Sequence, residues 1–368
     1  MIYLDYAATT PISPAARDAL MRALENFANP SSPHEAGLFA ERIVKEGRAA
    51  IGAALGVSPQ RIYFTSGGTE ANNWAVFSGQ IARKRMGGIL TTRAEHPSLL
   101  APIEHLQRQG VLVNFLNLDK NGKIYPDELA QAMEQKPGFV AISHVNNETG
   151  AIQDIAEIGR IIKARSPETI FHIDAAQSFC KININIANID TITISGHKIG
   201  APKGIGALFI RDGLALPPMI FGGGQENRLR SGTENVPGIA AMGAAAAARG
   251  DMAKNMEYIA SIRNAFIDAI RHIPGLNINI PEGSPYILSI SIENTRPEII
   301  VNALSAADIH ISTGAACSAR KKDASAAALH AQNIPKPLAT TALRISFAPA
   351  TTHAEIIAAA EALCKIIL

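Results

Sequence analysis

Ser195-Gly196-His197-Lys198 follows an apolar run, 189–194, that is typical of a buried strand, and a second apolar run begins at Ile205. A lysine at the end of a buried strand, among small and hydroxyl side chains, suits an amine that is partly desolvated. Buried lysines shift their pKa readily, which is why they serve in Schiff-base chemistry. A surface lysine in a glycine-rich turn would give the same pattern, so the choice depends on the rest of the chain.

Length and composition limit the classes of protein to consider. The chain has 368 residues, 47% of them hydrophobic and 18% charged, which predicts a globular protein with one large core and a smaller domain. The net charge is only +2 and no long basic block occurs, so direct nucleic-acid binding is not expected. No apolar stretch approaches the roughly 20 residues of a membrane span, and we expect no membrane contact.

The N-terminal residues and the cysteines bear on the cellular compartment in which the protein is expected. Residues 2–10 lack the charged and apolar regions of a signal peptide. The three cysteines, Cys180, Cys317 and Cys364, are far apart and form neither a disulfide framework nor a metal-binding pair. We therefore expect a cytoplasmic protein with no metal site.

Strand and helix patterns alternate over 61–210, and the strands are almost continuously apolar. This alternation predicts an α/β fold whose mostly parallel sheet is covered by helices on both faces. After Pro237 the pattern predicts one long helix to about His272, and then weaker strands and helices. We expect a large domain over 15–255 and a small α+β domain formed by 1–14 and 256–368.

Two further turns at predicted strand ends carry groups suited to a ligand. Gly68 and Thr69 lie where a strand, a Gly-Gly turn and a helix meet, and the free N–H groups there suit a phosphate, although many α/β turns look similar. Asp174 ends a strand, and Gln177 follows on the next turn. This aspartate could meet a protonated ring nitrogen, or it could cap the helix that follows.

Two more turns complete the set. His96 could stack on a flat ring or be an ordinary loop histidine. In Asn146-Asn147, an asparagine could donate to a ligand oxygen or hold the turn. Together with Lys198, these turns would supply a phosphate cup, an acid for a ring nitrogen, a stacking group and an amine. Those are the demands of pyridoxal phosphate (PLP).

With these motifs in order, the chain resembles the cysteine desulfurases of the NifS/IscS type, in the class V aminotransferase family of fold-type-I PLP enzymes. The resemblance covers nearly the whole chain and is highly specific because many ordered motifs share it. They are LDYAATTP (4–11), NPSS (29–32), SGGTEAN (66–72), EH (95–96), NNETG (146–150), DAAQ (174–177), SGHK (195–198), GGGQE (222–226), RSGTEN (230–235) and LRIS (343–346).

The resemblance implies a role for each matching residue. Lys198 would hold PLP as a Schiff base and later move the α-proton of the substrate. Asp174 would pair with the pyridine nitrogen, His96 would stack on the ring and act as an acid or base, and Gln177 would bond the ring hydroxyl. Arg344, together with Asn147, which also contacts the cofactor, would bind the substrate carboxylate. The protein would be a homodimer, and the phosphate of PLP would be held by Gly68, Thr69, Ser195, His197 and Thr233 of the partner subunit.

Cys317 lies in Thr313-Gly314-Ala315-Ala316-Cys317-Ser318, among small residues that suit an accessible thiolate. The resemblance implies that it attacks the sulfur of L-cysteine, becomes a persulfide and leaves L-alanine. The sulfur would pass to an acceptor protein for iron–sulfur cluster assembly or for thiolation of tRNA or DNA. Cys180 and Cys364 are interpreted as structural thiols.

Other functions remain open from the residues alone. A selenocysteine lyase, or another class V PLP aminotransferase or lyase, would use much of the same site. Cys317 separates them, because transamination has no use for a loop thiol and selenide release tolerates its loss. A non-enzymatic scaffold would not need Lys198, Asp174, His96 and Arg344 together.

Overall fold

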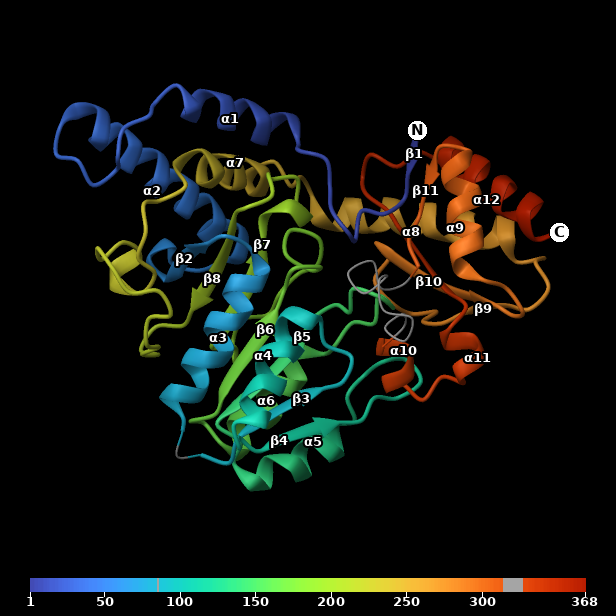
Figure 1. The fold of residues 1–368 in the computed structure, drawn as a ribbon, viewed down its shortest axis with the longest axis horizontal. Coiled ribbons are helices and arrows are strands. Elements are labelled where there is room, and N and C mark those ends of the chain that lie inside the picture. Colours follow the sequence, from blue (N-terminus) through green and yellow to red (C-terminus); the bar gives the residue numbers. More distant parts are fainter. Residues whose placement is uncertain (85, 314–326) are drawn as a thin grey trace.

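The computed structural model describes residues 1–84, 86–313 and 327–368, and its largest sheet has seven strands (Figure 1). Their order across the sheet is β2-β8-β7-β6-β5-β3-β4, and only the two pairings of β8 are antiparallel. The predicted, mostly parallel sheet is therefore confirmed. The strands are β2 (Ile62–Thr65), β3 (Ile89–Thr92), β4 (Val113–Leu116), β5 (Phe139–Ser143), β6 (Ile170–Asp174), β7 (Thr191–Ser195) and β8 (Gly206–Ile210).

Helices cover both faces of this sheet (Figure 1). Alternate residues of β5 show why: Phe139 packs in the core under α3 (Gly68–Ala82) and α4 (Pro97–Arg108), whereas Val140 packs on the opposite face. That opposite face is covered by α1 (Pro14–Leu24), α2 (Glu35–Leu55), α5 (Pro126–Ala132), α6 (Ile155–Arg165) and α7 (Val236–Ala247). In the described ranges, no helix combines the length and apolarity that crossing a membrane needs.

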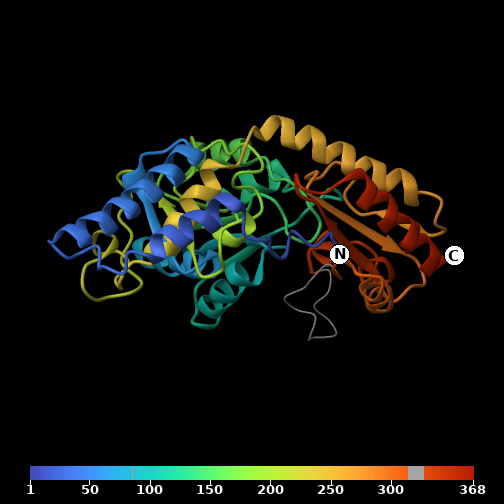
Figure 2. The ribbon, with the colours of Figure 1, turned by 90° about the horizontal axis from the view of Figure 1, so that it is seen from above.

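A second group of elements lies at one end of the molecule, around its own apolar core (Figure 2). An antiparallel sheet, β12-β10-β9, packs there with three helices, and β1 pairs in parallel with β11. The separate core supports the proposed small domain, although α8 begins just before residue 256. The elements are β1 (Ile2–Tyr3), α8 (Met252–Ile270), β9 (Leu276–Ile278), β10 (Ile287–Ile292), α9 (Pro297–Ala306), β11 (Ile309–His310), β12 (Ala342–Ser346) and α12 (His353–Ile367). Two short helices, α10 (Ala327–Ala331) and α11 (Lys336–Ala339), lie before β12, and Ala328 of α10 packs in the core of the large domain.

The prediction of one long helix from Pro237 to about His272 is wrong. The structure has two helices: α7 ends at Ala247, and Gly250, which adopts a left-handed backbone (φ +69°), turns the chain before α8 begins. Asp251 then starts α8, since its carboxylate accepts hydrogen bonds from the N–H groups of Ala253 (3.0 Å) and Lys254 (3.2 Å). The break lets α7 cover the large sheet while α8 packs against α12.

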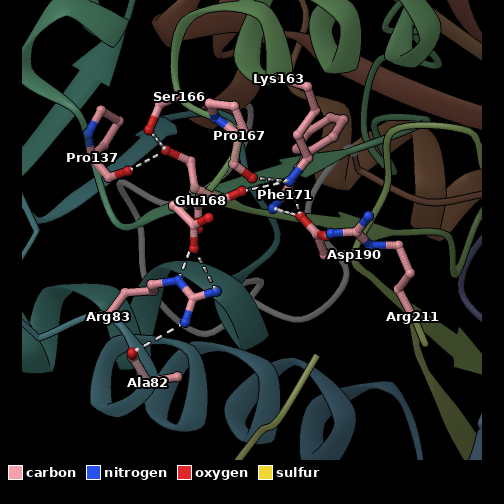
Figure 3. A network of polar contacts seen from close by, with 11 residues as sticks. Ala82, Arg83, Pro137, Lys163, Ser166, Pro167, Glu168, Phe171, Asp190 and Arg211 are labelled. Carbon is pink, nitrogen blue, oxygen red and sulfur yellow. Dashed lines mark hydrogen bonds and ion pairs between the residues drawn. The ribbon is translucent and has the colours of Figure 1, made fainter. Parts of the chain in front are cut away.

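A buried ion-pair network lies where β7 begins (Figure 3). The side chain of Asp190 is only 1% exposed, and it contacts both Lys163 Nζ and an Arg211 guanidinium nitrogen at 2.5 Å. It also accepts a hydrogen bond from the backbone N–H of Phe171 at 2.7 Å. Two cations and an N–H group thus balance the charge of this carboxylate.

Candidate active site

A cavity of about 430 Å³ opens at the carboxyl ends of the parallel strands. This is the end of a parallel sheet where α/β proteins bind their ligands. Ten of the predicted site residues line it: Gly68, Thr69, His96, Asn147, Asp174, Gln177, Ser195, His197, Lys198 and Arg344. Thr233 is exposed and does not line the cavity of its own chain. Cys317 lies outside the described residues.

One wall of the cavity is the N-terminus of α3, which begins at Gly68. Gly67 has φ +154°, and its backbone approaches β8 so closely that a Cβ on Gly206 would lie 2.7 Å from it. The N–H groups in the first turn of a helix have no acceptor within that helix, and the helix dipole is positive there. Because Ser195 lies beside Gly68, this wall offers N–H groups and a hydroxyl suited to a phosphate.

Asp174 is 6% exposed and lines the cavity at the end of β6. Its Oδ1 accepts a hydrogen bond from the N–H of Ala176 (2.9 Å), so the carboxylate caps the turn after β6, whereas the helix expected there from the sequence does not form. Its Oδ2 accepts one from Asn72 Nδ2 (2.8 Å). No lysine or arginine among the described residues forms an ion pair with it, so a cation in the cavity would supply the missing charge.

Asn72 and His172 extend from Asp174 as a buried chain that the sequence analysis did not assign. Asn72 Oδ1 lies 3.0 Å from His172 Nε2, and His172 Nδ1 lies 2.8 Å from Thr191 Oγ1. Burial lowers the pKa of His172 to about 3, so the ring is neutral. With the proton on Nε2, the ring donates to Asn72 and thereby fixes the amide group that donates to Asp174.

His96 caps α4 and faces the same cavity. Its Nδ1 accepts a hydrogen bond from the N–H of Ser98 (3.1 Å) and lies 2.7 Å from Ser98 Oγ. Burial lowers the pKa of His96, although the charge of Asp174 opposes this effect. The imidazole is therefore a neutral ring with its proton on Nε2, held in place by Ser98.

Lys198 ends the short turn after β7, and the N-terminal segment holds its amine. Nζ donates hydrogen bonds to the carbonyls of Ala7 (2.5 Å) and Ala8 (2.7 Å). Gln177 Nε2 also donates to Ala7 (2.9 Å), while Gln177 Oε1 is buried with no partner among the described atoms. For the adjacent His197, burial and then the charge of Lys198 lower the pKa to about 4.

Arg344 lies in β12 of the small sheet, is 2% exposed and lines the cavity. One guanidinium nitrogen pairs with Asp5 Oδ1 at 2.8 Å, and another donates to the carbonyl of Asn147 at 2.9 Å. Arg344 Nε is buried without a partner among the described atoms. Asp5, a positioning partner that the sequence analysis missed, leaves part of the guanidinium for a ligand.

Of the two neighbouring asparagines, one holds the turn and the other faces the cavity, where it could contact a ligand. Asn146 Oδ1 accepts hydrogen bonds from the N–H groups of Glu148 and Thr149, both at 2.9 Å, and its amide donates to the carbonyl of Ala94. Asn146 therefore holds the turn, whereas Asn147 lines the cavity.

The sequence matches a family of known proteins over nearly its whole length. A family profile described as "Aminotransferase class-V" matches residues 2–358. The chain belongs to the aminotransferase class-V family. Within it, the chain is similar to the protein named cysteine desulfurase IscS of Dictyoglomus turgidum (37% identical, 96% of this chain and 91% of the relative) and to that of Methanosarcina thermophila (35%, 96% and 89%).

Solved structures agree over the whole chain. A NifS-like protein superposes with a TM-score of 0.93 at 31% identity, covering 99% of this chain and 98% of the other. A structure described as SspA in complex with cysteine superposes with a TM-score of 0.83 at 33% identity, covering 96% and 100%.

Class-V aminotransferases are PLP-dependent enzymes, and the cavity fits that cofactor. The hydrogen-bond donors to the Asp174 carboxylate in the described ranges are neutral, and the carboxylate can take a protonated ring nitrogen. The buried Gln177 Oε1 can accept from a ring hydroxyl, and the N-terminus of α3 can take the phosphate. These two acceptors and one set of N–H donors therefore match the three polar ends of PLP.

Proposed function

We propose that this chain is a PLP-dependent cysteine desulfurase that converts L-cysteine to L-alanine and carries the sulfur as a persulfide on Cys317. The observation that carries the proposal is that Lys198, Asp174 and Arg344 line one cavity, because an amine, an acid for a ring nitrogen and a carboxylate receptor are what an amino-acid substrate requires. The long similarity to proteins named cysteine desulfurase supports the reaction type.

The residues that would hold the cofactor follow from their places around the cavity. Asp174 would bind the ring nitrogen, His96 would face the ring and Gln177 would bind the ring hydroxyl. When bound, PLP supplies an electron sink for the electrons released at the substrate carbon. The phosphate would be held by Gly68, Thr69, Ser195, His197 and Thr233 of the partner subunit, which makes the proposed enzyme a homodimer.

The chain's own groups would bind the substrate and move its protons. Arg344 would pair with the substrate carboxylate through the nitrogens that Asp5 leaves available, with Asn147 beside it. Lys198, held at the cavity by two backbone carbonyls, would take the α-proton and return a proton to carbon. His96, whose pKa is lowered by burial, would start as a neutral ring and act as an acid or base.

The sulfur step needs one more thiol. An S–S bond would form between Cys317 and the substrate sulfur while the substrate Cβ–S bond breaks, and the carbon would be protonated to give alanine. The thiol hydrogen and the carbon–sulfur electron pair balance this exchange without another oxidant. The persulfide sulfur would then pass to an acceptor protein, for iron–sulfur cluster assembly or for thiolation of tRNA or DNA.

The test compares wild-type protein with Cys317→Ala and with the control Cys364→Ala, which alters a cysteine of α12. Each purified holoenzyme receives L-cysteine and a thiol reductant, and alanine and sulfide are quantified together. We expect equal yields from wild type and Cys364→Ala. In Cys317→Ala both products should be lost, while L-cysteine still changes the absorbance of the bound PLP.

Three other outcomes would reject the proposal in different ways. Unchanged alanine and sulfide from Cys317→Ala would remove that residue from the reaction. A 2-oxo acid in place of alanine would indicate transamination. Selenide release from L-selenocysteine, with no sulfide from L-cysteine, would indicate a selenocysteine lyase.

A further inference from the structure

A second cavity, of about 370 Å³, adjoins the active-site cavity through Lys198, which lines both. Its walls come from the segment before α1, the turn after β6, the end of α7 and the segment after β12. Much of this surface is apolar and includes Ile12, Pro14, Phe347 and Pro349. Cavities of this size accommodate small molecules.

Two cations besides Lys198 face this space, and neither has an anionic partner among the described residues. Lys181 Nζ lies 5.8 Å from the ring centroid of Tyr286. Arg249 donates to the carbonyl of Ala246 at 3.2 Å, whereas its Nε is buried with no partner among the described atoms. Over the described ranges, no aspartate or glutamate lines the cavity.

Lys181 differs from another partly buried lysine, Lys163, in whether an anionic side chain lies beside it. Lys163 is paired with Asp190, but nothing comparable faces Lys181 in the described part of the chain. Burial, and then the charge of Lys198, lower the pKa of Lys181 to about 7. Cys180 cannot act as the counter-ion, because burial raises the pKa of its thiol to about 12.

We propose that this cavity binds a small organic anion, with its negatively charged head between Lys181 and Arg249 and its apolar body against the wall at Phe347. A carboxylate, sulfonate or phosphate head would give each cation a charge-assisted partner. Because Lys198 lines the same cavity, occupancy would also change the electrostatic environment of the amine in the active site.

The test titrates holoenzyme with the fluorescent probe anilinonaphthalene sulfonate, whose apolar body and anionic head match the cavity. We expect saturable binding to wild type that Lys181→Met and Arg249→Met each weaken by about tenfold or more. Lys181→Arg should retain most of the affinity. The exposed Lys336→Met, which removes the same charge elsewhere, should bind as wild type. The uncharged analogue phenylnaphthylamine should not distinguish the variants.

Thermal unfolding gives a second measurement on the same proteins. Octanoate should raise the midpoint of wild-type holoenzyme and leave that of Lys181→Met unchanged. Without octanoate, Lys181→Met should be at least as stable as wild type, because it removes a cation that lacks a counter-ion. Equal probe affinity in wild type, Lys181→Met and Arg249→Met would overturn the proposal. Loss of binding in Arg344→Gln alone would also overturn it, by placing the probe in the active site.

Discussion

Two buried aspartates lie at opposite ends of neighbouring parallel strands, Asp174 at the end of β6 and Asp190 just before β7. Asp190 is paired with Lys163 and Arg211, so its charge is balanced within the fold (Figure 3). Within the described part of the chain, Asp174 accepts hydrogen bonds from an amide and a backbone N–H group, and it faces a cavity. Both residues are buried aspartates, but the cations that balance Asp190 come from the protein, whereas a cation for Asp174 would have to come from a ligand.

This difference indicates how to separate a structural carboxylate from one that binds a ligand. A buried carboxylate whose cations come from the protein stabilises the fold, and removing it leaves those cations unpaired. A buried carboxylate with neutral partners is stabilised further only when a cation enters from outside. The two sites should therefore respond in opposite ways to loss of charge.

The largest expected effect is on stability in Asp190→Asn. The substitution leaves Lys163 and Arg211 without their counter-ion, and the free energy of unfolding should fall by about 3–5 kcal/mol. At a temperature where the variant is folded, kcat/KM for L-cysteine should stay within about twofold of wild type. Urea unfolding measures the free energy of unfolding. Asp212→Asn, at an exposed ion pair with Arg61, is the control and should cost at most about 1 kcal/mol. A loss in Asp190→Asn no larger than that of the control would contradict the comparison.

Asp174→Asn should show the reverse pattern. With PLP saturating, kcat/KM for L-cysteine should fall roughly 10²- to 10³-fold, about 2.7–4 kcal/mol, because the ring nitrogen loses its counter-ion. Unfolding of the PLP-free protein should change by less than about 1 kcal/mol, since asparagine keeps an acceptor for the N–H of Ala176. If the variant kept its activity and unfolded as easily as Asp190→Asn, the two sites would not differ in the proposed way.

The smallest effect concerns the pH dependence of stability near Asp174. The pKa of His172 is about 3 in the folded protein, below its ordinary value of about 6.5. The unfolded chain therefore binds a proton that the folded chain does not, and this stability, full above pH 6.5, is lost as pH falls toward 3. From pH 7 to pH 5 the loss is about 2 kcal/mol. His172→Gln should lose about that much less than wild type over the same range in denaturant titrations. An identical slope in both proteins would show that His172 is not buried as a neutral ring.

Much of the fold could be predicted because the apolar patterns are local and strong. The sequence patterns predict a helix over 155–165 and a strand over 287–292, and α6 (Ile155–Arg165) and β10 (Ile287–Ile292) have these bounds. The break between α7 and α8 was missed because an alanine-rich run and an apolar helix pattern flank Gly250 and Asp251 closely. The glycine and the capping aspartate were the signals that could have located it.

The candidate site could be predicted only in part. Asp174 and Lys198 follow recognisable strands, so topology alone brings them together. Asn72 and His172 are 100 residues apart, and no sequence pattern shows that their side chains meet. The choice between Asn146 and Asn147 likewise depends on the direction of each side chain in one turn, which composition does not contain.

The attachment of the N-terminal segment has a consequence for biosynthesis. Ala7, whose carbonyl meets Lys198, donates its own N–H to Ser346, which is 339 positions further along the chain. At a synthesis rate of about 5–20 residues per second, a ribosome needs roughly 20–70 s to travel between those two residues. The N–H of Ala7 therefore waits for Ser346, while the large sheet and the contacts of Ala7 with Gln177 and Lys198 can already form. Loop closure over such a high sequence separation is costly, so the junction between this N-terminal segment and β12 is expected to be among the last parts of the enzyme to assemble.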